Sequence, residues 1–293
     1  RDKLGYDYLY GPDIIRDYHS PLYTEMLAFS LAEINPTLSQ DAINEAIFKL
    51  KNFDSIHLVQ KNKVFMDYLQ NGIEVSTLHN GEPKYDRIKL IDYDNPDLNS
   101  FVVINQWTVI DNEQRRPDVV IFINGLPLVV VELKSCSREE TDASAAYRQL
   151  RNYMHDVPSL FVYNAFCIMS DLATSKAGTI TANEDRYMEW KTTDGDYEET
   201  RYATFDVLFE GMLEKRRLLD IIKNFMVFSD DVKILAGYHQ YFAVKKAIER
   251  SITATSTDGK GGVVWHTQGS GKSLSMVFYT KLLQEALQSP TVV

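Results

Sequence analysis

Cysteine is scarce in this sequence, where Cys136 and Cys167 are the only two among 293 residues. Two cysteines provide neither a disulfide framework nor the thiolates that a cysteine-based zinc site needs. Six histidines are scattered, and no two lie four residues apart, so the sequence offers no helical pair of metal ligands. This usage fits a reducing compartment, and we expect a cytoplasmic protein.

Long apolar runs are also lacking, because no segment approaches the ~20 residues that a membrane-spanning helix needs. The chain begins RDKLGYDYLYG, which has neither the basic start nor the apolar centre of a signal peptide. With 44% hydrophobic and 25% charged residues, the composition is typical of a globular protein. We therefore expect no contact with a membrane.

Positive charge is in deficit, because 31 Lys and Arg residues stand against 41 Asp and Glu residues, a net charge of -10. A protein that coats nucleic acid by bulk electrostatics needs the opposite balance, since clustered Lys and Arg make the phosphate contacts. The deficit argues against that class of protein but leaves room for a local basic cleft.

Hydrophobic periodicity predicts helices first and then a sheet. Apolar residues recur every three or four positions at 21–34 and 39–50, with Ser39 or Asp41 as a helix N-cap. From residue 86 the period becomes two, in runs rich in β-branched residues, which predicts strands. Strands are expected at 87–93, 100–110, 118–123, 126–134 and 166–172. Helices are expected at 141–157, capped by Thr141, and at 205–225.

A second domain is predicted to begin between residues 228 and 236. Its elements are expected as a helix at 233–252, a Gly-rich break at 257–262, a strand at 263–267, a helix after 273 and the start of a strand at 289–293. The fold class is therefore α/β, with one domain over 1–228 and the incomplete beginning of another over 229–293.

Three polar residues stand out in RPDVVIFINGLPLVVVELK, residues 116–134. Asp118 heads one apolar run, and Glu132 and Lys134 end the next. Residues i and i+2 of a strand share a face, so Glu132 and Lys134 point the same way. Asp118 shares that face only if facing residues in the hairpin have numbers with an even sum.

The turn between the two runs decides that sum. A two-residue loop at Asn124-Gly125 gives 249 and separates the carboxylates, whereas a three-residue loop with a glycine bulge gives an even sum. We predict the bulged form, with Gly125 at positive φ.

Asp118 and Glu132 would then form an oxygen-rich site suited to Mg²⁺. Lys134 beside them is placed to orient a water molecule and to stabilise charge on a phosphate, which indicates metal-assisted phosphodiester hydrolysis. An incidental ion pair at a solvent-facing strand end is the competing interpretation, because both motifs are short.

The order of helices, strand pair and further helix resembles the PD-(D/E)xK nuclease fold, a mixed sheet flanked by helices. The further helix holds QLRNY, in which Gln149 and Tyr153 share a face, similar to the Q-x-x-x-Y element of certain DNA-processing enzymes. The resemblance implies that these two residues hold DNA or order the site. Arg148 and Arg151 beside them either meet phosphates or form a solvated helix face. A first-helix acid often joins such sites, and the candidates are Glu33 and Glu45.

A phosphate-binding loop is predicted where a short apolar strand meets a helix in VVWHTQGSGKSLSMVFYTKLL. Backbone N–H groups would cradle a β-phosphate, Lys272 would reach the β- and γ-phosphates of ATP, and Ser273 would bind Mg²⁺. The loop residues are Thr267, Gln268, Gly269, Ser270, Gly271, Lys272 and Ser273. His266 replaces the usual leading glycine, a form that resembles the RecA-like motors of superfamily 2 helicases. Upstream, Gln240 resembles the glutamine of the Q motif, which reads adenine.

In this order the motifs resemble the restriction (motor) subunit of type I restriction-modification enzymes. The resemblance implies Mg²⁺-dependent cleavage of double-stranded DNA, coupled to ATP-driven translocation, with separate specificity and methyltransferase subunits. It implies that residues 1–293 alone do not hydrolyse ATP, because the rest of the motor is missing. Two other classes stay open, a DNA repair helicase-nuclease and a non-catalytic docking and ATP-sensing module.

Overall fold

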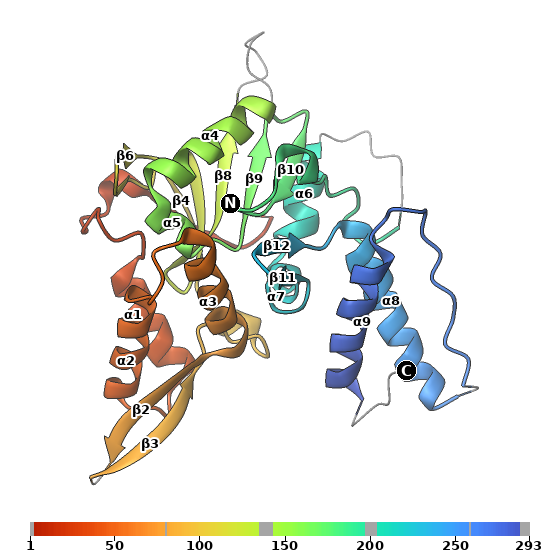
Figure 1. Ribbon diagram of the computed structural model, residues 1–293, viewed down its shortest axis with the longest axis horizontal. Helices are drawn as coiled ribbons and strands as arrows, with labels where there is room; N and C mark the ends of the chain where they lie inside the picture. The colour runs from red at the N-terminus through yellow and green to blue at the C-terminus, as the bar shows by residue number, and fades with distance from the viewer. Residues whose placement is uncertain (1–2, 80, 135–142, 197–203, 258, 288–293) are drawn as a thin grey trace.

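The computed structural model describes residues 3–79, 81–134, 143–196, 204–257 and 259–287, and its centre is a six-stranded sheet (Figure 1). The strands, in spatial order, are β1 (Asp7–Tyr10), β4 (Phe101–Asn105), β7 (Val119–Ile123), β8 (Leu126–Leu133), β9 (Phe166–Ser170) and β10 (Ser175–Gly178). β1 is parallel to β4 and β8 to β9, whereas the other neighbours are antiparallel. The predicted mixed α/β fold with a mixed sheet is confirmed.

Both faces of the sheet are covered, because its inner strands are apolar on both sides. Along β7, Val120 and Phe122 face one core, and Ile121 and Ile123 face the other. The first core includes α4 (Ala143–Asp156) and α5 (Pro158–Val162), and the second includes α1 (Thr24–Ile34), α2 (Gln40–Lys51) and α3 (Leu58–Asn71). Figure 1 shows α4 lying across β8 and β9, so side chains on that face of the sheet point toward α4.

The first 100 residues follow the prediction in their helices but not in their strands. Ser39 is the N-cap of α2, and its Oγ accepts a hydrogen bond from the Ala42 amide at 3.2 Å. The strand predicted at 87–93 is wrong, because the chain there ends a separate two-stranded ribbon that projects from the body (Figure 1). This ribbon consists of β2 (Ile73–His79) and β3 (Glu82–Ile88).

Two predicted elements are interrupted. The strand predicted at 100–110 ends at Asn105, because Gln106 has a left-handed backbone with φ of 58°, and continues as the short β5 (Val109–Ile110), paired with β6 (Gln114–Arg115). The helix predicted at 205–225 is two helices, α6 (Thr204–Met212) and α7 (Lys215–Asn224). Glu214 separates them by capping α7. The Thr141 cap lies outside the described residues.

The chain after residue 225 departs furthest from the prediction. The strand pair β11 (Met226–Ser229) and β12 (Val232–Leu235) spans the predicted boundary, so the helix predicted at 233–252 begins later, as α8 (Tyr238–Thr255). Residues 263–267 form no strand, because no strand in the described part of the chain pairs with them. They lead to α9 (Lys272–Ala286), which packs along α8. The strand start expected at 289–293 lies outside the described residues.

Lys233 anchors the β11–β12 pair in the body of the molecule. Its side chain is buried, and its Nζ donates hydrogen bonds to Asn62 Oδ1 at 2.9 Å and to the Asn164 carbonyl at 2.6 Å. The Thr179 and Thr181 hydroxyls donate to its backbone carbonyl. Burial lowers the pKa of Lys233 to about 7, because the charged form loses its hydration.

This lowered pKa predicts that the free energy of unfolding rises with pH above 7. Between about 7 and the usual lysine value of about 10.4, the unfolded chain holds a proton that folded Lys233 has released, so raising the pH favours the folded state. From pH 7 to pH 9 we expect a gain of about 2 kcal/mol, which the Lys233→Met protein should lack. Denaturant titrations of both proteins at pH 7, 8 and 9 measure this difference, and parallel pH dependences would contradict it.

Candidate functional site

The register of the β7–β8 hairpin determines which face its polar ends occupy. Beside the turn, Ile123 pairs with Leu126, a sum of 249, whereas further along Ile121 pairs with Val129, a sum of 250. The skipped residue between the two registers is Leu128, which is therefore a β-bulge. Beyond the bulge the sum stays even, as predicted.

The turn itself differs from the predicted loop. It contains two residues, Asn124 and Gly125, with φ of 52° and 80°, as a tight two-residue hairpin turn requires. The positive φ of Gly125 is confirmed, but the three-residue loop is wrong, because the extra residue lies within β8. One extra residue puts Asp118 and Glu132 on the same face of the sheet whether it lies in the turn or within β8.

The even register places Asp118 opposite Glu132, on the face toward α4. Asp118 Oδ2 accepts a hydrogen bond from the Leu133 amide at 3.0 Å, and Glu132 Oε1 accepts one from Lys134 Nζ at 2.6 Å. Glu132 is only 2% exposed. Burial raises the pKa of Glu132, the hydrogen bond from Lys134 opposes this rise, the charge of Asp118 adds to it, and a hydrogen bond with Tyr153 also opposes it.

Helix α4 brings its two predicted residues to the same cluster. Burial raises the pKa of Tyr153, and the negative charges of Glu132 and Asp118 raise it further, while a hydrogen bond with Gln149 opposes the shift. Asp118, Gln149 and Tyr153 also line one open cleft of about 550 Å³. The structure thus brings together the five residues predicted from the strand pair and the helix.

Neither acid considered from the first helices joins this cluster. Glu33 is exposed on α1, and Glu45 on α2 forms an ion pair with Lys49 at 3.9 Å. Helix α1 packs against Gly125, at the turn end of the hairpin, whereas Glu132 lies at the far end. Among the described residues, no three His, Cys, Asp or Glu side chains converge. Two carboxylates still suffice for Mg²⁺, which keeps several waters.

The cleft also contains residues that the sequence analysis did not select, namely Gln106, Gln114, Arg115, Arg116, Asn152 and Asp156. Arg116 lies within the RPD motif, so its position next to Pro117 was a usable signal. No sequence motif marks Gln106 or Asn152. They line the cleft because Gln106 follows the end of β4 and Asn152 lies on α4.

The predicted phosphate-binding loop leads directly into α9. Gly269 and Gly271 have φ of 81° and 77°, a conformation that glycine adopts without steric cost. Exposed Ser273 follows Lys272, whose Nζ donates to the carbonyls of His266 and Thr267 at 3.1 and 2.9 Å. The first N–H groups of a helix lack partners within it and favour an anion. Two glycines with positive φ therefore lead into the start of α9, and the Lys272 side chain is turned onto the loop.

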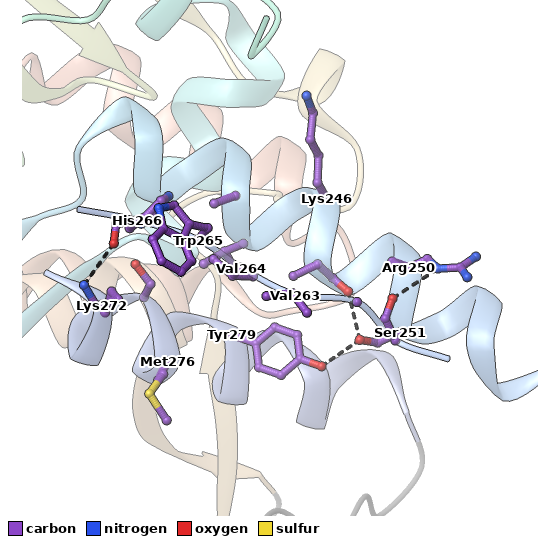
Figure 2. A pocket seen from close by; sticks show the side chains of 16 residues that line it. Lys246, Arg250, Ser251, Val263, Val264, Trp265, His266, Lys272, Met276 and Tyr279 are labelled. Atoms are coloured by element: carbon purple, nitrogen blue, oxygen red, sulfur yellow. Dashed lines mark hydrogen bonds between the residues drawn. The ribbon is translucent and has the colours of Figure 1, made fainter. Parts of the chain in front are cut away.

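Two cavities meet at this loop. One, of about 620 Å³, lies between α8, α9 and the segment 261–266 and is largely apolar, as Trp265, Met276 and Tyr279 illustrate (Figure 2). The other, of about 640 Å³, is also largely apolar and is lined by Gly269, Ser270 and Gly271 together with β12 and the segment 178–188. The glycine backbone thus opens on the second cavity, while Lys272 borders the first.

Gln240 lies against the loop and is buried. Its Oε1 accepts a hydrogen bond from the Gly237 amide at 2.9 Å, and its Nε2 donates to the Gly271 carbonyl at 3.1 Å. The side chain thus caps α8 and ties it to the glycine loop. Reading adenine stays a prediction, and this buried amide would have to exchange at least one of these bonds for the base.

These features define a mixed α/β chain with a paired-carboxylate and lysine cluster, followed by a glycine loop at a helix start. A family model described as the type I restriction enzyme R protein N terminus matches residues 1–186, and one described as the SWI2/SNF2 ATPase matches residues 239–293. The first match covers more than half of the chain. The chain therefore belongs to the family of type I restriction enzyme R protein N-terminal regions.

Known relatives agree with this family. The type I restriction enzyme HindI endonuclease subunit of Haemophilus influenzae is 36% identical over 99% of this chain and 30% of its own length. A relative from Methanocaldococcus jannaschii is 32% identical over 99% of this chain and 31% of its own length. The chain thus spans less than a third of these relatives. None of the described helices combines the length and apolar character that crossing a membrane requires.

Proposed function

We propose that this chain contains the DNA-cutting part and the beginning of the motor of a type I restriction enzyme. The first part would be a PD-(D/E)xK endonuclease that cleaves double-stranded DNA with Mg²⁺. Residues 229–293 would begin a RecA-like motor that translocates DNA at the expense of ATP. Specificity and methyltransferase subunits would be separate partners in a cytoplasmic complex. The observation that carries this proposal is the even register that places Asp118 opposite Glu132.

In this proposal Asp118 and Glu132 hold the ion, and water completes its octahedral ligand set. The burial of Glu132 supports this assignment, because a buried carboxylate is costly unless positive charge compensates it. When bound, Mg²⁺ would polarise a phosphoryl oxygen and lower the pKa of a water molecule.

The protein side chains supply the rest of the chemistry. Lys134 favours the ionised form of Glu132 despite its burial, and its ammonium group is placed to stabilise charge on the attacked phosphate. Tyr153, hydrogen-bonded with Gln149, covers the carboxylates from α4 and orients groups bound between them. ATP would bind at the glycine loop, where Lys272 exchanges the His266 and Thr267 carbonyls for phosphate oxygens and Ser273 binds its Mg²⁺.

The test uses the complete subunit assembled with its partners on supercoiled DNA, with cleavage and ATP consumption recorded together. We expect Asp118→Ala to lose cleavage, because half of the carboxylate pair is removed, and to keep ATP consumption, because the glycine loop is unchanged. Chelation of Mg²⁺ should stop both activities. If Asp118→Ala cuts DNA at the normal rate, the carboxylate cluster is structural and the proposed function is wrong.

A further inference from the structure

Two arginines line the cleft beside Asp118, and of these only Arg115 has a side-chain partner among the described residues. Arg115 Nε donates to Asp156 Oδ2 at 2.6 Å, and the Glu113 amide donates to the Asp156 carbonyl at 3.1 Å. These two contacts attach the β5–β6 hairpin to the end of α4. The charge of Arg115 is therefore used within the protein.

Arg116 is in the opposite situation. It lines the same cleft and is exposed, and it forms no hydrogen bond or ion pair with any residue that the structure describes. Its backbone is nevertheless well positioned, because buried Pro117 follows it and restricts it to extended conformations. Asp118, two residues on, is held by its carbonyl, which accepts a hydrogen bond from the Gln106 amide at 3.0 Å. The backbone beside Arg116 is thus held next to Asp118, while its exposed guanidinium has no partner among the described residues.

A phosphate group that enters this cleft meets the negative charge of Asp118. The rest of the chain does not compensate, since its net charge is -10. The lining also includes Arg115 and Asp156, whose charges are paired with each other. Its remaining side chains are uncharged, namely Tyr153 and the amides of Gln106, Gln114, Gln149 and Asn152. Arg116 is therefore the charged side chain best placed to favour a phosphate there, and its planar fork suits two phosphate oxygens.

We propose that Arg116 binds a backbone phosphate of the DNA strand that is cut, and so holds that strand against Asp118 and Glu132. This inference rests on the proposed nuclease function. It makes Arg116 a substrate-binding residue that acts on the bound DNA strand and leaves the metal to the carboxylates. Its ligand is a phosphodiester, so the contact carries no base specificity.

The experiment compares wild type, Arg116→Ala, Arg216→Ala and Asp118→Ala in the complete subunit assembled with its partners. Arg216 on α7 is the matched control, because it is another exposed arginine but does not line the cleft. Cleavage of supercoiled DNA is followed from low to moderate salt, with ATP consumption as the readout of the motor. Thermal unfolding checks that each variant folds.

We expect Arg116→Ala to slow cleavage roughly ten- to hundredfold, the size of a lost charge-assisted hydrogen bond, with unchanged ATP consumption. The slope of log rate against log salt should become shallower by about 0.9, the effect of one phosphate contact. Arg216→Ala should match wild type in both respects.

Three outcomes overturn the inference. If Arg116→Ala cuts DNA normally while Asp118→Ala is inactive, the proposed phosphate contact is disproved but the nuclease assignment stands. Slower cutting with an unchanged salt slope, or an equal loss in Arg216→Ala, shows that Arg116 acts without a specific phosphate contact. Normal cutting by Asp118→Ala means that the proposed function itself has failed.

Discussion

Replacing Lys134 by methionine is expected to slow DNA cleavage by roughly 10²- to 10⁴-fold, the range for loss of a positioned proton-transfer or charged group. Lys134 Nζ lies 2.6 Å from Glu132 Oε1 and is a neighbouring positive charge for this buried carboxylate. ATP consumption should not change, because Lys134 lies at the end of β8 and the glycine loop lies before α9. The complete subunit with its partners and supercoiled DNA provides both measurements.

The pH dependence of the residual cleavage separates two roles of Lys134. Burial already raises the pKa of Glu132, and without the opposing hydrogen bond the pKa should rise further. If Lys134 mainly keeps Glu132 ionised, the acid limb of the rate profile shifts to higher pH and alkaline buffer restores part of the activity. If it mainly stabilises charge on the phosphate, activity stays low at all pH values. Normal activity of Lys134→Met at neutral pH would contradict both roles.

Lys134→Arg provides the control for charge. Arginine keeps a positive charge beside Glu132 but does not release a proton in this pH range. Recovery of cleavage in this variant would assign Lys134 an electrostatic role, whereas continued loss would assign it a role that needs the compact amine.

The parts of the site that could be predicted are those set by local geometry. The i and i+2 rule places Glu132 with Lys134, and helical spacing places Gln149 with Tyr153, whatever the rest of the chain does. The position of the bulge could not be predicted, because a one-residue insertion anywhere between the turn and Asp118 gives the same even sum. Leu128 is the residue inserted, and the choice depends on how β8 packs against its neighbours.

The errors arise where tertiary contacts override a local pattern. Residues 263–267 have the composition of a strand, but a strand needs a neighbouring strand, and the described residues provide none beside them. Lys233 begins the segment 233–252 that was predicted as a helix, but it lies in β12, where its Nζ donates hydrogen bonds to Asn62 on α3 and to Asn164 after α5. Arg116 was overlooked for a related reason. Arg116 is not used by Asp156, because Arg115 forms that ion pair. Arg115 and Asp156 are 41 positions apart in the sequence, so this choice could not be predicted from the local pattern.

Gly125→Ala is expected to destabilise the protein by about 3–5 kcal/mol, because two penalties combine at the turn. Gly125 has φ of 80°, which costs an L-residue roughly 1–2 kcal/mol. A Cβ at this position would lie 2.6 Å from the Tyr23 carbonyl oxygen and 2.5 Å from the Leu27 nitrogen, both backbone atoms at the start of α1. Backbone atoms cannot swing aside as a side-chain end can, so either the helix or the hairpin must shift.

Gly81→Ala is the matched control for this prediction. Gly81 has a similar φ of 87°, but a Cβ there would meet no atom within 4 Å. Its loss should therefore be about 1 kcal/mol, the conformational penalty alone. Denaturant unfolding of both variants measures the difference, which is the cost of pushing α1 away from the turn. Equal losses would show that α1 yields easily to the hairpin. A larger loss at Gly125 would show that contact with α1 stabilises the turn end of the hairpin that carries Asp118 and Glu132.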